Sequence, residues 1–176
     1  MAGITPKASN HANLPPQASR FVDVVALPWE KTSFPGVEAK TLLIDRDSGL
    51  LTVLLKMGPG AKLPDHEHVL IEQTYLLSGT LVCGEGTVTA GNFVWRPAGS
   101  RHEAWAGPEG NLSLAMFQIP NRFDLADGAV RDFVGNDWEK NWGEALRRHE
   151  ASGLVHRQVP RATCRESARS APTAGR

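Results

Sequence analysis

The residues of this chain that are best suited to chemistry are three histidines and a glutamate, all between Gly60 and His102. They are His66, His68, Glu72 and His102. Imidazole nitrogen suits iron, zinc, copper and nickel, and a carboxylate adds a harder oxygen ligand. Four such ligands would leave two open positions on an octahedral ion, and open positions are what catalysis requires. The residue types therefore predict a divalent-metal site that can also bind a substrate.

The spacing of these residues indicates how strands would bring them together. Residues i and i+2 of a strand lie on the same face, so His66 and His68 are expected to point the same way. Glu72 has the same parity and follows a four-residue step that can round a bend into the next strand. His102 opens a further strand after a Pro-Ala-Gly turn. We expect a small β-barrel to bring this strand across to the other three ligands.

The surrounding sequence is typical of strands and tight turns. From residue 21 to about residue 118, short apolar runs alternate with Gly, Pro, Asp and Asn, and many runs carry β-branched or aromatic residues. None of these runs sustains a helical period. The expected strands are FVDVVAL, KTLLID, LLTVLLKM, QTYLLS, TLVC, TVTA, NFVWR and LSLAMFQI. Many short strands at regular spacing predict an all-β sandwich or barrel.

A helical pattern follows the strands, over residues 136–153. Asn136 is expected to cap the helix, with Glu139 three residues later. The apolar residues expected on one face are Trp138, Trp142, Ala145 and Leu146. We expect this face to pack on the barrel or on a second subunit.

These patterns divide the chain into four parts. Residues 1–20 are polar and are expected to form a loose arm, and residues 21–135 the barrel. The helix occupies residues 136–153. Residues 154–176 are rich in Arg, Ser, Ala and Pro and are expected to form a flexible tail. A length of 176 residues fits one domain.

Charge and cysteine content exclude several classes of partner. Nineteen basic residues offset nineteen acidic ones, which gives no electrostatic case for nucleic acid or a membrane surface. No apolar run approaches the roughly 18 residues that a membrane helix needs. Cys83 and Cys164 are too few and too far apart for a disulfide framework or a zinc knuckle. We therefore expect a cytoplasmic protein with reduced thiols and a small-molecule substrate.

The motif residues, taken as a set, resemble the two conserved motifs of the cupin superfamily. The first motif, G-x5-H-x-H-x3-E-x6-G, runs from Gly60 to Gly79, and every fixed position matches. The second motif, G-x5-P-x-G-x2-H-x3-N, begins at Gly91 and matches up to His102. Ala106 stands where the family often has Asn, and this departure involves no ligand.

The resemblance covers about residues 37–120, with its motif core at residues 60–106. It implies an all-β, single-domain, RmlC-like cupin: a double-stranded β-helix, or jelly-roll barrel, followed by the C-terminal helix. Cupins of this kind usually pair through their outer strands, so we expect a homodimer. The metal ligands that the resemblance implies are His66, His68, Glu72 and His102.

The runs PGVEAKTLLID, GPGAKLPDHEHVLIEQTYLLSGTL and AGNFVWRPAGSRHEAW are similar to one branch of the superfamily. That branch includes acetylacetone-cleaving and dihydroxyacetophenone-cleaving dioxygenases and the cupin domain of a zinc-binding anti-sigma factor. The resemblance implies a non-haem dioxygenase that cleaves a C–C bond of a small diketone or hydroxyketone. The acetylacetone-cleaving type lacks the glutamate, so Glu72 also fits the zinc-binding sensor. Glu72 could be a fourth ligand, a base near the metal, or a hydrogen-bond partner of a ligand water.

The resemblance also implies a cofactor and a set of residues around it. We expect ferrous iron, with zinc, manganese and nickel as alternatives. Alternative functions are a zinc-binding sensor or regulatory cupin and a redox-neutral isomerase or decarboxylase. The expected catalytic residues are Glu72, Gln73, Arg101 and Glu103. Arg96 and Arg101 are each expected either near the ligands or on the rim. Candidates for the pocket wall are Tyr75, Trp95, Trp105, Met116 and Phe117.

Overall fold

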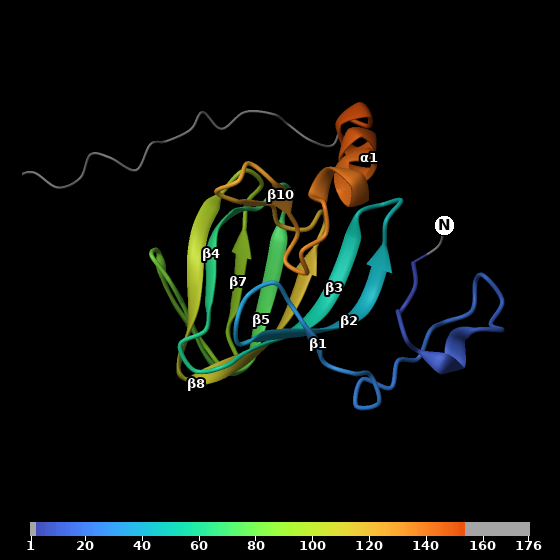
Figure 1. Ribbon diagram of the computed structural model, residues 1–176. Coiled ribbons are helices and arrows are strands. Elements are labelled where there is room, and N and C mark those ends of the chain that lie inside the picture. The colour runs from blue at the N-terminus through green and yellow to red at the C-terminus, as the bar shows by residue number, and fades with distance from the viewer. Residues whose placement is uncertain (1–2, 154–176) are drawn as a thin grey trace, which may run out of the picture.

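The computed structural model describes residues 3–153, which form an antiparallel jelly-roll barrel with a helix at one end (Figure 1). A short 3-10 turn, η1 (Ser9–His11), precedes the barrel, and helix α1 (Trp138–Ala151) follows it. The strands are β1 (Glu30–Lys31), β2 (Val37–Asp45), β3 (Leu50–Met57), β4 (Lys62–Glu67), β5 (Glu72–Cys83), β6 (Gly86–Thr89), β7 (Phe93–Arg96), β8 (Arg101–Phe117), β9 (Phe123–Asp124) and β10 (Val130–Arg131). The predicted all-β class is confirmed.

The long strands β5 and β8 organise the barrel. The main sheet runs in the order β1-β2-β3-β8-β5-β6, and all of its pairings are antiparallel. The first residues of β8 pair with β4 and its last residues pair with β3, while β5 pairs with β8 from Ala104 to Phe117. β7 pairs with the beginning of β5. One strand, β8, therefore links the elements that carry the site.

Alternate residues of these strands point inward and form the core. Its buried members include Val37, Leu51, Val53, Leu76 and Phe117. Burying a Val, Leu or Phe side chain stabilises a fold by about 1.5–3 kcal/mol. The closed apolar interior gives the strands that carry the histidines a rigid support.

β5 is one continuous strand, although the sequence predicts two runs separated at Gly79. Gly79 has φ +72°, and a Cβ at this position would lie 2.0 Å from the carbonyl oxygen of Gly110 on β8. The β5–β8 register shifts between Gly79 and Leu81. Glycine therefore allows β5 to bend against β8 without breaking the sheet.

The expected strand FVDVVAL is wrong, because the structure has a turn there. The Asp23 carboxylate accepts hydrogen bonds from the backbone N–H groups of Val25 and Ala26, at 3.1 and 3.2 Å. This arrangement is an Asx-type turn, in which the side chain satisfies the backbone groups that a strand would pair. Phe21 and Val25 are 80% and 90% exposed, and Leu27 is the residue of this run that is buried.

The first described residues are attached to the barrel. Ile4 forms an antiparallel bridge with Ile44 of β2, and the Thr5 hydroxyl donates a 2.6 Å hydrogen bond to the carbonyl of Leu42. The segment from residue 3 to residue 20 therefore includes an anchored part as well as exposed loop, a difference from the loose arm that composition suggests.

Helix α1 packs its tryptophan face on the end of the barrel. Trp138 and Trp142 are buried beside Leu70 and Ile119. The indole of Trp138 donates to the carbonyl of Pro120 at 2.9 Å. The alternative that this face is reserved for a second subunit is therefore wrong.

The helix begins one residue later than the sequence suggests. Asp137, and not Asn136, is the N-cap, and its side chain accepts the backbone N–H of Lys140. The predicted flexible tail, residues 154–176, lies outside the described residues.

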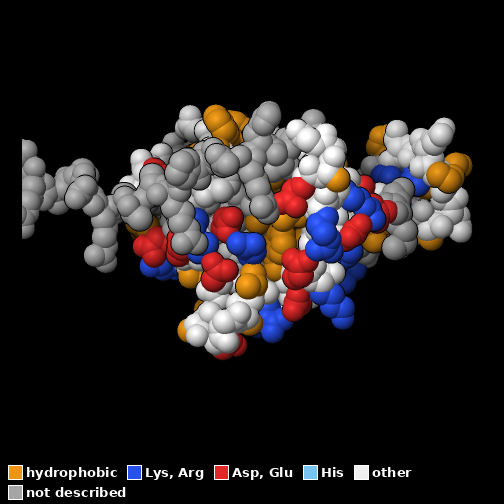
Figure 2. Space-filling view, turned by 90° about the horizontal axis from the view of Figure 1, so that it is seen from above, with side chains coloured by type: hydrophobic (Ala, Val, Ile, Leu, Met, Phe, Trp, Pro, Cys, Tyr) orange, Lys and Arg blue, Asp and Glu red, His pale blue; other side chains and the backbone are white. Residues whose placement is uncertain are grey.

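The face of the molecule at the helix end carries both signs of charge. Figure 2 shows acidic and basic side chains interspersed there, in agreement with the formal net charge of zero. Among residues 3–153, no helix has both the length and the apolar character needed to cross a membrane.

Candidate metal centre

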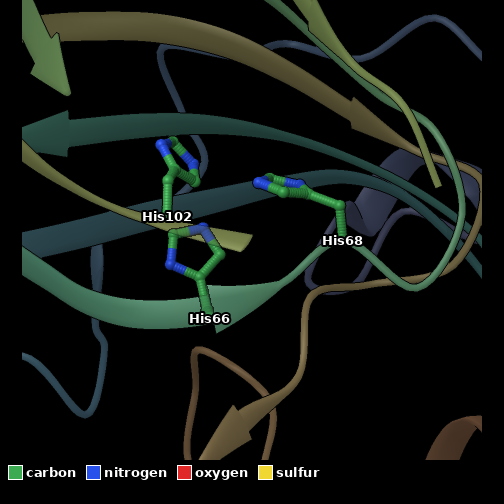
Figure 3. A group of neighbouring side chains, drawn as sticks. All are labelled: His66, His68 and His102. Atoms are coloured by element: carbon green, nitrogen blue, oxygen red, sulfur yellow. The ribbon is translucent and has the colours of Figure 1, made fainter. Parts of the chain in front are cut away.

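The pairing of β4 with β8 brings two of the histidines face to face. His66 lies opposite His102 in the register, and their ring centroids are 4.8 Å apart. His68 follows β4, and its backbone is fixed by hydrogen bonds to Ser100 and Gly99 in the turn that precedes β8. Figure 3 shows the three imidazoles directed toward one another. The predicted convergence of these residues is present in the structure.

The cluster has the geometry and unsatisfied atoms of a metal site. One ligand nitrogen from each histidine lies within 4.8 Å of the others, a separation that a shared ion with bonds of about 2.0–2.1 Å can span after modest ring rotation. Nε2 of His68 and Nδ1 of His102 are buried without a hydrogen-bond partner, whereas Nδ1 of His68 faces the carboxylate of Glu72 at 2.9 Å. Buried polar atoms in folded proteins nearly always have a partner. A divalent metal fits these residues.

Burial keeps the imidazoles of His66 and His102 neutral. It lowers the pKa of His66 to about 4, against a raising effect of the Pro64 carbonyl. It also lowers the pKa of His102 to about 3, and the positive charge of Arg96 lowers it further. At neutral pH both rings therefore keep the lone pairs that metal binding needs.

A backbone acceptor identifies the free nitrogen of His66. Its Nδ1 lies 2.8 Å from the carbonyl oxygen of Pro64, which can only accept a hydrogen bond. Nδ1 therefore carries the proton, which leaves Nε2 as the nitrogen with a free lone pair. Such an outer hydrogen bond is how metal-binding histidines are commonly oriented.

Glu72 lies behind His68 at the start of β5. One of its carboxylate oxygens is 2.9 Å from Nδ1 of His68 and accepts a 3.0 Å hydrogen bond from the amide of Asn121. The other oxygen accepts a 2.7 Å hydrogen bond from the Thr74 hydroxyl. Burial pushes the pKa of Glu72 upward, but the hydrogen bond and charge of His68 and the charge of Arg96 hold it well below its usual range.

These contacts give Glu72 the position of a residue that orients His68. The role of Glu72 as a fourth metal ligand stays a prediction. Asn121 and Thr74 were not anticipated from the sequence. Thr74 shares the strand parity of Glu72, which is a usable signal, whereas Asn121 comes from a loop with no pattern that points to the site.

Arg96, at the end of β7, lies inside the barrel and not on the rim. It is 5% exposed and sits opposite Glu72 in the β5–β7 register. Its positive charge is the common neighbour of His66, Glu72 and His102. The sequence left both positions of Arg96 open, and the structure selects the interior one.

The cavity beside the histidines is small and mostly aliphatic. Its volume is about 30 Å³. Its apolar lining consists of Leu55, Met57, Leu63, Leu81, Ala104 and Ala115. None of the five expected wall residues lines it. Trp95, for example, is 56% exposed on the outer face of β7.

The structure does not bring Gln73, Arg101 and Glu103 to this cavity. Gln73 points outward from β5, on the opposite face to Glu72. Arg101 forms ion pairs with Asp65 and Asp124 on the rim, and Glu103 pairs with Lys62. Of the four residues expected to be catalytic, only Glu72 is at the site.

Cys83 is a further neighbour that the sequence did not place at the site. It is buried, and its sulfur comes within 4.8 Å of ligand atoms of Glu85 and His102. Cys83 also accepts a 3.6 Å hydrogen bond from Arg96. The inward parity of Cys83 on β5 was a signal for this position.

The sequence matches the family of ChrR cupin-like domains over residues 17–121. The chain belongs to this family, and it is therefore a cupin. Cupins typically hold a divalent metal, which agrees with the histidine cluster described above. No protein with a curated description matches the chain.

Solved structures show the same architecture. A candidate acetylacetone dioxygenase from Methylibium petroleiphilum superposes with a TM-score of 0.59 at 21% identity, covering 74% of this chain and 94% of that one. An acetylacetone dioxygenase from Acinetobacter johnsonii gives 0.58 at 18% identity, with coverage of 74% and 93%. An RmlC-like cupin from Ralstonia eutropha gives 0.58 at 21%, with coverage of 80% and 93%. At these identities the similarity shows the shared fold.

Proposed function

We propose that this cupin is a non-haem, metal-dependent dioxygenase that cleaves a C–C bond of a small diketone or hydroxyketone. The observation that carries the proposal is the cluster of His66, His68 and His102 beside a small cavity, in which burial keeps His66 and His102 neutral. Three protein ligands leave positions for substrate on the ion, as in catalytic rather than structural sites. The similarity to two solved structures named for acetylacetone dioxygenase activity supports the reaction class.

Dioxygen is the only co-substrate that the proposed reaction needs. A 1,3-diketone and O2 give a carboxylic acid and a 2-oxoaldehyde, with one C–C bond broken and both oxygen atoms kept in the products. When bound, ferrous iron supplies the Lewis acidity that favours the enolate of a chelated diketone. The aliphatic walls at Leu55, Leu63 and Leu81 would exclude water from the reacting centre.

In this proposal the residues have two roles: some would hold the metal, and others would orient its ligands. His66, His68 and His102 would hold the metal, with the Pro64 carbonyl fixing the His66 ring. Glu72 would orient His68, and Thr74 and Asn121 would fix Glu72. The low pKa of Glu72 makes it a weak proton acceptor, which supports orientation over general-base chemistry.

The test is oxygen uptake by protein loaded anaerobically with ferrous iron. A panel of β-diketones and aryl hydroxyketones is expected to give uptake that His102→Ala abolishes. His11→Ala, at an exposed histidine near the N-terminus, is the matched control and should keep full uptake. Absence of uptake across the panel, with iron bound, would reject the proposal. Turnover without oxygen on a manganese-loaded protein would instead identify a redox-neutral isomerase or decarboxylase.

A second candidate is a zinc-binding sensor or regulatory cupin. The family description, ChrR cupin-like domain, and the retention of Glu72 favour it. This candidate predicts a zinc-filled, four-coordinate site with Glu72 as the fourth ligand and no open position. X-ray absorption of protein purified without added metal distinguishes three nitrogen ligands plus solvent from a closed site.

We also propose that the chain forms a homodimer through the outer face of β5 and β7. Tyr75, Leu77, Phe93 and Trp95 are exposed there, and Tyr75 lies directly opposite Phe93 in the register. Contiguous exposed apolar residues on a sheet often mark an interface. Sedimentation velocity should show a dimer that Trp95→Glu converts to a monomer, and a wild-type monomer at micromolar concentration would contradict it. The free thiol of Cys83 agrees with the cytoplasmic location that we propose.

A further inference from the structure

Arg96 is a buried cation without a matching anion. Among residues 3–153, no carboxylate lies within ion-pair distance of its guanidinium. Its Nε is buried without a hydrogen-bond partner, and Nη2 donates only to the sulfur of Cys83, at 3.6 Å. Thiol sulfur is a weak acceptor. Charged side chains that proteins bury are normally paired, so the guanidinium has unused capacity to bind an anion.

Glu72 does not neutralise Arg96, although the two residues lie opposite each other in the β5–β7 register. One of its oxygens is taken by Thr74, and the other lies between Asn121 and His68. The charge of Arg96 acts on Glu72 at long range and holds its pKa down, but no hydrogen bond joins the two side chains within the described residues. The carboxylate of Glu72 is therefore committed to His68.

Arg96 also faces the cavity that the histidines line. Arg96, His66 and His102 contribute to the same small cavity. A ligand oxygen in that cavity would be close both to the histidine cluster and to the guanidinium. Guanidinium groups bind carboxylates with two parallel hydrogen bonds, a geometry that lysine or a neutral donor does not supply.

We propose that Arg96 binds a carboxylate group of the substrate, so that among small β-dicarbonyl compounds this site selects a keto acid. The inference rests on the metal site of the proposed function but not on its oxygen chemistry. Arg96 is a specificity-determining residue in this view: it selects the anionic ligand, while the histidines hold the metal.

The size of the cavity limits the ligand. A volume of about 30 Å³ is close to the space of one water molecule, so only a compact head group fits beside the histidines. Met57 lines both this cavity and a groove of about 890 Å³ whose lining includes Trp29 and Phe34. The side chain of Met57 is flexible, so its rotation would let the remainder of a longer keto acid extend into the groove.

Acetoacetate and acetylacetone make a matched pair of probes, because they have the same shape and differ in a carboxylate against a methyl ketone. Binding to cobalt(II)-loaded protein can be followed by the visible spectrum without any turnover. The ratio of the affinity for acetoacetate to the affinity for acetylacetone should be at least about tenfold higher in the wild type than in Arg96→Met, the factor expected for one charge-assisted contact. Comparing this ratio between proteins removes the difference in how strongly the two probes chelate the metal, and Arg96→Lys should give an intermediate ratio.

Arg101→Gln is the control, because Arg101 is an arginine of the same barrel that faces solvent. It should retain the wild-type ratio of the two affinities. In metal-free protein, acetoacetate should raise the thermal midpoint of the wild type and not that of Arg96→Met. Circular dichroism of each variant checks that the fold is intact.

The outcomes separate this inference from the proposed function. A ratio of acetoacetate to acetylacetone affinity that is the same in the wild type and in Arg96→Met would overturn the role of Arg96. A ratio that depends on Arg96, together with no oxygen uptake by the iron-loaded protein, would reject the dioxygenase and keep the carboxylate subsite.

Discussion

Arg96 and Arg101 lie five positions apart and flank the same turn, yet the protein treats them in opposite ways. Arg101 is exposed on the rim, where Asp65, Glu67 and Asp124 neutralise it. Arg96 is buried beside the histidines, and no carboxylate neutralises it within the described residues. Neighbouring carboxylates therefore balance the charge of Arg101, whereas the charge of Arg96 has no such partner among the described residues.

This difference between a paired and an unpaired arginine affects how strongly each face of the barrel can bind an anion. Exposed ion pairs contribute about 0–1 kcal/mol each, because water screens them. A buried charge without a partner costs several kcal/mol, which a ligand of opposite charge can recover. The inner face is therefore arranged for a ligand, and the outer face for stability of the free protein.

The largest expected effect on this comparison comes from removing an inner histidine. His102→Ala should weaken metal binding by more than about 100-fold, beyond what loss of an outer hydrogen-bond partner costs. The measurement is competition for cobalt or zinc against a chromophoric chelator. His11→Ala should bind metal like the wild type. Equal affinity in the two variants would show that the inner cluster is not the metal site.

Acid should destabilise the metal-free protein through the same inner histidines. Burial places the folded-state pKa of His66 at about 4 and that of His102 at about 3, both below the ordinary value of 6.5. As the pH falls below 6.5 the unfolded chain takes up protons that the folded protein refuses, so stability falls until the pH reaches the folded-state values.

Between about pH 7 and about pH 5.5, the loss in free energy of unfolding should be about 2 kcal/mol, since His102 is partly exposed and counts for less. Urea denaturation at both pH values measures it. His102→Gln should reduce the difference, because it removes one of the two groups. A wild-type stability that is flat across this range would contradict the expectation.

Glu72 and Glu103 offer a comparison of two carboxylates, one on each face. Glu72→Gln should weaken metal binding by about tenfold, because the amide still accepts from His68 but without the charge. Glu103→Gln should leave it unchanged, since Glu103 pairs with Lys62 outside the barrel. The measurement is the same metal competition. A loss in Glu72→Gln far above 100-fold would favour direct ligation by Glu72.

The smallest expected effect is a difference between the two arginines in how salt changes the stability of their variants. Arg101→Gln should lower the free energy of unfolding by at most about 1 kcal/mol, and added salt should remove the difference. The stability change of Arg96→Met, whichever its sign, should respond little to salt, because the guanidinium is buried. Urea titrations at low and high ionic strength measure both. A salt response that is equal in the two variants would remove the distinction between the faces.

The site was predictable where strand periodicity applies. The parity of His66, His68 and Glu72 correctly indicated a shared face, and the turn before His102 correctly indicated a strand that crosses to them. The same alternation places Gln73, Arg101 and Glu103 on the outer face, although their nearness to the ligands in sequence had suggested a role. Nearness along a strand is a poor guide, because adjacent residues point to opposite sides.

Local pattern was also insufficient where side chains compete with the backbone. The run FVDVVAL has strand composition, but Asp23 binds the backbone of Val25 and Ala26 and forms a turn. Asn121 reaches Glu72 across 49 positions of sequence, a contact that only the closed barrel creates. Composition and periodicity carry no information on such distant pairs.

The sequence by itself determined the fold family, the three histidines and the face on which they meet, because these depend on residue type and on a period of two. The tertiary structure decided that Glu72 lies against His68, that Arg96 is inside the barrel, and that the cavity walls are aliphatic. These facts depend on the closure of β4, β5, β7 and β8 around one interior. Burial and pairing of a charge are properties of that closed interior and not of any one segment.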